Sequence, residues 1–186
     1  MYDTSAFKRG LKIEIDGKPF EIIEFQHVKP GKGGAFVRTK LKNMINGRVL
    51  DQTFRSGEKV GKPDLQEREM QYLYKDGDNF CLMDNETYDQ IFLPEDQMGD
   101  RRRFLVENLT VSMLFFNGKP VGIELPMFVE LTVTDTDPGV KGDTASKVTK
   151  PATLETEAIV PVPIFINVGD KIKVDTRKGS YVERAK

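Results

Sequence analysis

Residues 11–17, with the sequence LKIEIDG, decide the fold class of this chain of 186 residues. Apolar and charged side chains alternate along the first five positions, which is the period of a strand that buries one face. The next two residues, Asp-Gly, are a strong signal for a tight hairpin turn, and residues 20–25 supply the returning strand. Residues 35–41 alternate again, and an Asn-Gly turn follows at residues 46–47. Short strands separated by such turns predict a small β-barrel.

The rest of the chain continues this pattern with one interruption. Strands are predicted at residues 70–74 and 80–83, whereas the stretch from Pro94 to Asn108 predicts a single short helix near Phe104. A polar break near residue 63 and a new run of strands near residue 128 divide the chain into thirds of about 60 residues, a size at which small β domains fold alone. We therefore predict an all-β chain of three small β-barrels, at residues 1–63, 64–128 and 129–186.

The composition excludes several kinds of functional site. With one cysteine (Cys81) and one histidine (His27), the chain cannot form an intramolecular disulfide or a metal centre built from several Cys or His ligands. A Ser-His-Asp or Cys-His site would have to use His27, and we expect both residues to serve packing instead. Residues 57–63 approach a P-loop but are one residue short and place Pro63 where Mg²⁺ needs a hydroxyl. We expect a protein that is not an enzyme and holds neither a cofactor nor a metal.

Hydropathy predicts where the protein works. The first ten residues, MYDTSAFKRG, contain no apolar segment of the kind found in a secretory signal. No uncharged apolar run is long enough to span a bilayer. We therefore expect a soluble, cytoplasmic protein with no membrane partner.

Charge is distributed unevenly along the chain. The formal net charge is −1, but residues 1–62 hold 13 Lys and Arg against 7 Asp and Glu. Residues 63–128 reverse the balance, with 6 against 13, and residues 129–186 hold 9 of each. A basic first third favours contact with phosphate, whereas an acidic middle third avoids phosphate or meets a basic protein. The alternative is that these charges only solvate the barrel surfaces, and composition leaves both interpretations open.

One loop in the basic third has a distinctive composition. Residues 29–34, Lys29-Pro30-Gly31-Lys32-Gly33-Gly34, connect two predicted strands. Proline fixes its own φ and restricts the residue before it, while the three glycines permit positive φ and place no Cβ near the tip. The pattern predicts a hairpin tip that presents one cation, Lys32, whose ammonium lies about 6 Å beyond its Cα. A flexible glycine-rich turn with an incidental lysine is the alternative.

Further motifs accompany this loop along the chain. They are residues 29–38 (KPGKGGAFVR), 70–74 (MQYLY), 136–144 (TDPGVKGDT), 150–154 (KPATL) and 174–182 (VDTRKGSYV). In this order and spacing they resemble the bacterial translation elongation factor P family, and the resemblance covers essentially the whole chain. Two positions depart from the family pattern, Glu157, where a glycine is usual, and Pro161.

The resemblance implies a fold and a function. The fold is an SH3-like (KOW-like) barrel followed by two OB-like barrels, in an L-shaped arrangement about the size of a tRNA. The function is binding to the 70S ribosome between the P and E sites, beside peptidyl-tRNA, to stimulate peptide-bond formation and relieve stalling at consecutive prolines. The residue matching Lys32 reaches the CCA end of that tRNA at the peptidyl-transferase centre, and a partner enzyme commonly extends it covalently. The expected partners are the ribosome, its rRNA, the P-site tRNA and a lysine-modifying enzyme, for a chain that we expect to be a monomer.

Other candidate residues have ordinary structural alternatives. Arg38, Lys40 and Lys42 alternate along the strand after the loop, so they share one face that is well placed for tRNA phosphates. The resemblance adds a loop near E-site mRNA and a chain end that faces tRNA and the small subunit. The residues concerned are Lys141, Gly142, Asp143, Thr144, Arg177, Tyr181 and Arg184. The alternatives are solvated strand positions and, for Tyr181, a half-buried barrel residue, and we expect the three arginines 101–103 only to balance acidic charge.

Two other functions remain open at this stage. A general single-stranded RNA-binding OB-fold protein needs several exposed aromatic side chains for base stacking, and the 5 Tyr and 12 Phe residues here mostly alternate into strand interiors. A small hydrolase needs a carboxylate pair, and none stands out from the charged background. Affinity for ribosomes compared with free RNA tests the first alternative, and turnover in the absence of ribosomes tests the second.

Overall fold

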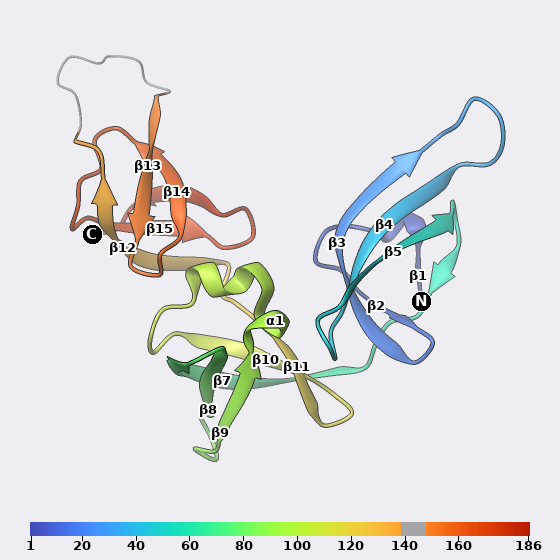
Figure 1. The fold of residues 1–186 in the computed structure, drawn as a ribbon, viewed down its shortest axis with the longest axis horizontal. Helices are drawn as coiled ribbons and strands as arrows, with labels where there is room; N and C mark the ends of the chain where they lie inside the picture. Colours follow the sequence, from blue (N-terminus) through green and yellow to red (C-terminus); the bar gives the residue numbers. More distant parts are fainter. Residues whose placement is uncertain (139–147) are drawn as a thin grey trace. The chain divides into compact units, whose positions relative to one another are not determined.

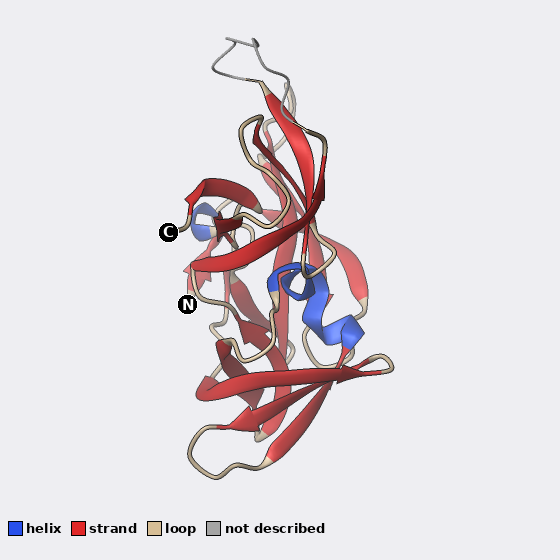
Figure 2. Cartoon of the chain, turned by 90° about the vertical axis from the view of Figure 1, so that its left-hand side faces the viewer, coloured by secondary structure: helices blue, strands red, loops and turns tan. Residues whose placement is uncertain are grey.

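The computed structural model describes residues 1–138 and 148–186 and consists mostly of strands (Figure 1). The predicted all-β class is confirmed. The helical elements of the described residues are short, and they are drawn in blue in Figure 2: η1 (Thr4–Ala6), α1 (Glu95–Met98) and η2 (Gly99–Phe104). Within these described ranges, no helix has the length and apolar character needed to cross a bilayer.

The first part of the chain folds into a four-stranded antiparallel sheet in the order β2-β3-β4-β5. Its strands run Lys12–Ile15 (β2), Lys18–Val28 (β3), Phe36–Asn43 (β4) and Val49–Arg55 (β5), and a second, two-stranded sheet pairs β1 (Tyr2–Asp3) with β6 (Lys59–Val60). The predicted turn joins β2 to β3, with φ of 51° at Asp16 and 73° at Gly17. Two successive positive φ values are what the tightest hairpin turns require, so the local sequence specifies this pairing.

One face of this sheet builds the core of the first part of the chain. Ile13, Ile22 and Val37 are completely buried there, as the period-2 pattern of their strands requires. The rings of Phe7 and Phe54 meet edge-on in the same core, with centroids 5.3 Å apart. This packing gives the long strands β3 and β4 a fixed base.

The middle of the chain forms a five-stranded sheet in the order β11-β10-β7-β8-β9. Its strands run Leu65–Asp76 (β7), Asn79–Asp84 (β8), Gln90–Pro94 (β9), Thr110–Phe116 (β10) and Lys119–Glu124 (β11). The described chain divides into two compact units, residues 1–68 with 113–122 and residues 69–112 with 123–186. The connected ends of β10 and β11 belong to the first unit, where Leu114 and Phe116 cluster with Met44. The predicted domain boundaries, and the predicted arrangement of the barrels, stay predictions.

The last sheet has the order β14-β13-β12-β15-β16. Its strands run Phe128–Thr136 (β12), Thr149–Leu154 (β13), Ile159–Pro163 (β14), Lys171–Asp175 (β15) and Ser180–Arg184 (β16). Leu131 and Ile172 are completely buried between these strands, and Phe104 from η2 lies in the same apolar cluster at 2% exposure. A segment that comes before the sheet in the chain is therefore part of its core.

The region predicted as one short helix contains α1 followed directly by the 3₁₀ helix η2. Arg102 pairs with Glu95 and Arg101 pairs with Glu124, at 3.2 Å for the second pair, so these two arginines do balance acidic side chains. Arg103 has a different role. Its guanidinium donates to a carbonyl of the last sheet, that of Ile159, at 3.3 Å.

The two departures from the family pattern lie in and beside the β13–β14 turn. Glu157 has φ of 70°, in the left-handed region that favours glycine, while its N–H donates to the carbonyl of Leu154 at 2.8 Å. Pro161 on β14 pairs with Pro151 on β13. Because proline has no N–H, this pair suits a position of the ladder where no hydrogen bonds are exchanged. β14 is also an edge strand, where proline discourages pairing with another chain.

Candidate functional site

The predicted lysine loop is the tip of a long two-stranded arm. β3 and β4 pair from Phe20–Asn43 outward to Val28–Phe36, and the loop comprises the residues between the last two partners. Figure 1 shows the loop carried at the far end of these two strands. The N–H of Ser56 donates to the carbonyl of Ala35 at 3.0 Å, which holds the base of the loop. Residues 29–34 are all exposed, so the tip stands free of the core that supports it.

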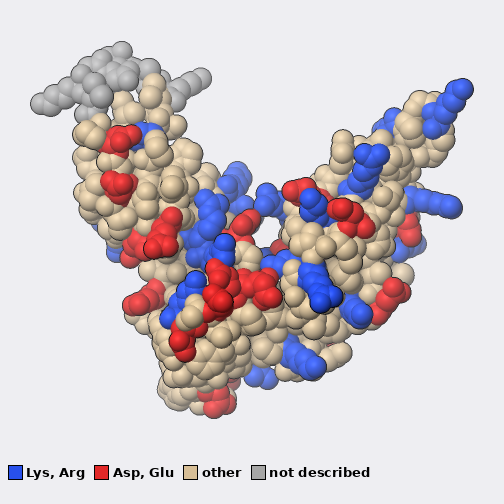
Figure 3. Space-filling model, in the orientation of Figure 1, with Lys and Arg blue, Asp and Glu red and all other residues tan. Residues whose placement is uncertain are grey.

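The arm determines how far a positive charge can reach. The chain takes four peptide steps from Val28 to Lys32, so the Cα of Lys32 lies at most about 14 Å beyond the last strand pair. The side chain adds about 6 Å. Figure 3 shows Lys and Arg side chains, in blue, at the end of the arm. An amine on this support can enter a recess while the barrel remains outside it.

The three loop glycines differ in backbone conformation. Gly33 has φ of +94°, whereas Gly31 and Gly34 do not have positive φ. A Cβ built on either Gly31 or Gly34 would meet no atom of the chain within 4 Å. The sequence permits positive φ at all three positions, but the tip uses it at Gly33, which turns the chain back toward β4.

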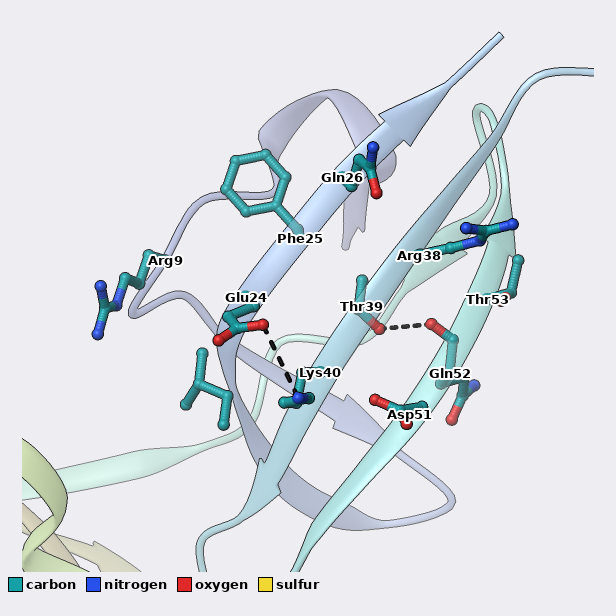
Figure 4. A pocket seen from close by; sticks show the side chains of 11 residues that line it. Arg9, Glu24, Phe25, Gln26, Arg38, Thr39, Lys40, Asp51, Gln52 and Thr53 are labelled. Atoms are coloured by element: carbon teal, nitrogen blue, oxygen red, sulfur yellow. Dashed lines mark hydrogen bonds and ion pairs between the residues drawn. The ribbon is translucent and has the colours of Figure 1, made fainter. Parts of the chain in front are cut away.

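The outer face of β3, β4 and β5 carries a hollow of about 730 Å³ (Figure 4). Arg38 and Lys40 line it from β4, and Lys42 lies two residues further along the same strand. Cross-strand pairing places Lys40 between two carboxylates, with Glu24 on one side and Asp51 on the other. The Lys40 Nζ lies 3.9 Å from Glu24 Oε2. The positive charge of Lys40 is therefore offset by acidic neighbours, which compete with any phosphate for it.

Arg38 has a different environment on the same face. Its cross-strand partners are Gln26 and Thr53, which carry no charge. The guanidinium carbon lies 5.3 Å from the centre of the Phe36 ring, and the side chain is exposed. A planar guanidinium with neutral neighbours can offer two parallel N–H donors to one phosphate. Of the two cations that line the hollow from β4, Arg38 is the one without an acidic cross-strand partner.

The candidates in the last part of the chain lie on the β15–β16 hairpin. The Arg177 side chain is 63% exposed, and its Nε lies 3.8 Å from Oδ1 of the buried Asp175. Tyr181 packs half-buried against the core of the last sheet, where burial raises its pKa above the usual value. The exposed Arg184 lies 5.9 Å from the centre of the Phe165 ring. Tyr181 therefore occupies the half-buried barrel position that was the alternative to an RNA contact. The loop residues 141–144 lie outside the described residues.

Two features near the arm could not be found by sequence reasoning. His27, which was expected to serve packing, is exposed on β3 and contacts Phe25 edge-on, with ring centroids 5.7 Å apart. β3 runs past the core at this point, so alternation no longer decides burial. The pairing of Glu24 with Lys40 depends on a register shift between Ile22 and Glu24, for which the sequence carries no evident signal.

No group of three His, Cys, Asp or Glu side chains in residues 1–138 and 148–186 is arranged to hold a metal ion. Cys81 is buried, as expected, and its Sγ lies 3.6 Å from the amide oxygen of Gln90. The arrangement instead suits positioning, since it holds an exposed amine at the end of a supported arm.

Comparison with known proteins assigns each part of the chain to the same family. Residues 3–60 match the family model for the elongation factor P KOW-like domain, residues 65–123 the elongation factor P OB domain, and residues 129–184 the elongation factor P C-terminal domain. Elongation factor P of Nitratidesulfovibrio vulgaris, strain Miyazaki F, is 60% identical over 99% of this chain and 100% of its own. That of Maridesulfovibrio salexigens is 61% identical over the whole of both chains.

A similar solved structure is also found outside the bacteria. It is the protein titled eukaryotic translation initiation factor 5A from Methanococcus jannaschii, with 28% sequence identity. The match covers 67% of this chain and 93% of that protein, with a TM-score of 0.44.

Proposed function

The chain belongs to the elongation factor P family of translation factors, and from this premise we propose that it binds the 70S ribosome between the P and E sites, beside peptidyl-tRNA. There it stimulates formation of peptide bonds between consecutive prolines, where ribosomes stall. The observation that carries this proposal is the exposed Lys32 at the end of the β3–β4 arm. A cation delivered at this distance from its barrel suits a target inside another assembly.

The physical basis is the geometry of proline. Its ring fixes φ, so a prolyl or peptidyl-prolyl end fits poorly into the attack geometry of peptide transfer. A misplacement of about 1 Å can cost on the order of 10² in rate. The Lys32 amine braces the CCA end of the P-site tRNA and reduces the positional freedom that must be lost before reaction. The ribosome performs the chemistry, and the factor contributes position and charge without proton transfer.

The N-terminal barrel contributes a second contact in this proposal. Arg38 binds a tRNA phosphate on the outer face of the sheet, while the carboxylates beside Lys40 leave that residue a smaller role. In the third barrel, the exposed Arg177 and Arg184 contact RNA in this proposal. The exposed tip also lets a lysine-modifying enzyme reach Lys32 without unfolding the barrel.

A loop-variant experiment tests the role of Lys32. Synthesis of a Pro-Pro-Pro peptide is timed on purified ribosomes with wild-type protein, with Lys32→Ala and with Lys29→Ala as the matched control. Both lysines are exposed in the same loop, so charge and accessibility are comparable. We expect Lys32→Ala to lose the stimulation while Lys29→Ala keeps most of it. Equal rates for Lys32→Ala and the wild type would overturn the proposal.

Three further measurements test the proposed partners. We expect Arg38→Ala to weaken binding to ribosomes that carry P-site tRNA, and Lys40→Ala to weaken it less. A protein that binds unstructured RNA as tightly as it binds ribosomes would instead be a general RNA-binding protein. Intact-mass analysis of protein from its native host, followed by mapping of the loop peptide, shows whether Lys32 carries an added group.

A further inference from the structure

For most glycines in the described residues, the folded chain itself explains why the position requires glycine. Of the glycines in the described residues, ten have positive φ, a conformation that other residues rarely adopt. Gly61 has ordinary φ, but a Cβ there would lie 3.3 Å from the Cβ of Glu14. Gly122 is buried inside β11. Gly31 and Gly34 are the two that have neither positive φ, nor burial, nor an atom near the missing Cβ.

The isolated chain therefore gains nothing from glycine at these two positions. Glycine loses more conformational freedom on folding than any other residue, and alanine at a compatible position usually stabilises a protein. The two glycines nevertheless lie immediately on either side of the Lys32-Gly33 pair. Their shared effect is that the backbone beside Lys32 has no side chain on its flanks. Such a shape matters only when another molecule surrounds the tip.

We propose that Gly31 and Gly34 determine specificity for the partner: the tip enters an RNA-lined passage that accepts bare backbone and the Lys32 side chain but no Cβ at either flank. This inference rests on the proposed function, because it concerns the cavity that receives Lys32. The charge of the loop favours RNA as the lining, since residues 29–34 carry two lysines and no acidic side chain. Gly33 has another role, as a positioning residue that turns the chain back toward β4.

The two roles predict different effects for alanine substitution. Alanine at position 31 or 34 leaves the free protein unchanged, because its methyl group meets open space. In the bound state the same methyl group must displace closely packed atoms of the partner. Overpacking of that kind corresponds to a loss of about 5- to 150-fold in affinity. Alanine at Gly33 instead changes the free loop, because a residue with a Cβ is strained at φ of +94°.

Loss of flexibility is the competing explanation for any effect at positions 31 and 34. Alanine already removes most of the conformational freedom that distinguishes glycine, so a flexibility effect is nearly complete at alanine. A steric effect grows with side-chain volume instead. A series of Ala, Ser and Val at position 34 separates the two explanations by whether the loss increases along the series.

The experiment compares unmodified proteins, so that differences in Lys32 modification cannot contribute. Gly31→Ala, Gly34→Ala, Gly34→Ser, Gly34→Val, Lys29→Ala and Lys32→Ala are measured for thermal unfolding, for ribosome affinity and for the rate of Pro-Pro-Pro synthesis. We expect Gly31→Ala and Gly34→Ala to unfold at or above the wild-type temperature while losing at least about 5-fold in affinity or rate. The loss should deepen from Ala to Val. Lys29→Ala, which removes one loop charge but keeps the Lys32 side chain, should lose less than Lys32→Ala.

The outcomes distinguish the two proposals. If Lys32→Ala loses stimulation while Gly31→Ala and Gly34→Ala keep it, the steric inference is wrong and the proposed function stands. An equal loss for Ala, Ser and Val also overturns the steric inference, in favour of flexibility. If Lys32→Ala keeps full stimulation, the proposed function itself fails.

Discussion

Phe104 provides the sharpest test of how the second unit is held together. Its side chain, on η2, is 2% exposed within the apolar cluster of the last sheet. Two contacts beside it fix the segment, since the hydroxyl of Thr156 donates to the carbonyl of Arg103 and the Arg103 guanidinium donates to the carbonyl of Ile159. Replacement by alanine removes the ring and leaves these hydrogen bonds in place. The change therefore isolates the contribution of the ring.

The expected loss is large for a unit of this size. Truncation of a buried Phe to Ala costs about 3–5 kcal/mol, from lost burial and from the cavity that remains. A typical domain is stable by only about 5–15 kcal/mol, so the variant loses a substantial part of its stability. With an unfolding entropy of about 2.1 cal/mol/K per residue over about 100 residues, the midpoint of thermal unfolding falls by roughly 14–24 °C if the second unit unfolds as one.

Calorimetry and urea unfolding measure this effect, with Phe92→Ala as the matched control. Phe92 on β9 is 46% exposed, so the same truncation there should change stability by no more than about 1 kcal/mol. Amide exchange should accelerate in β12 to β15 of the Phe104→Ala variant, because their core has lost its ring. A Phe104→Ala protein that loses less than about 1 kcal/mol, with unchanged exchange in those strands, would refute the assignment of η2 to that core.

Two further predictions concern single positions. Glu157→Gly should stabilise the protein by about 0.5–1 kcal/mol in urea unfolding, because relief of left-handed strain at φ of 70° exceeds the added entropy of the unfolded chain, and a destabilised variant would contradict this. Burial, reinforced by Glu107 and Cys81, raises the pKa of Tyr72 above 10.0. The neutral tyrosine is therefore favoured in the folded state, so its contribution to stability is complete below about pH 10 and is lost as pH rises through the folded pKa. Tyr72→Phe should lose less stability than the wild type between pH 9 and about 11.5, measured by urea unfolding with tyrosine absorbance as the ionisation readout.

The sequence predicts those parts of the fold that are specified locally. The Asp16-Gly17 hairpin follows from two residues whose positive φ values set both the turn and the register. The exposure of residues 29–34 follows in the same way from a glycine-rich stretch between two strands. Such features depend on neighbours in the chain, and local patterns contain that information.

Features that depend on distant parts of the chain could not be predicted. Phe104 looks like one apolar residue of a short helix, and only the folded chain shows that it completes the core of the last sheet. The register shift after Ile22 likewise decides that Glu24, and not Ile23, pairs with Lys40, because a shift of one residue moves a side chain to the other face. His27 is exposed for a related reason, because its strand continues beyond the end of the core.

The separation between the arm and its support has a consequence for how this protein can vary. Residues 29–34 are exposed and lie beyond the last strand pair, so a change at the tip costs the barrel little folding free energy. A change at Val37 or Phe54, by contrast, opens a cavity in the core on which the arm stands. Loss of function without loss of stability is therefore expected at the tip. If tip variants unfolded the barrel, the arm would be a structural element and not a probe.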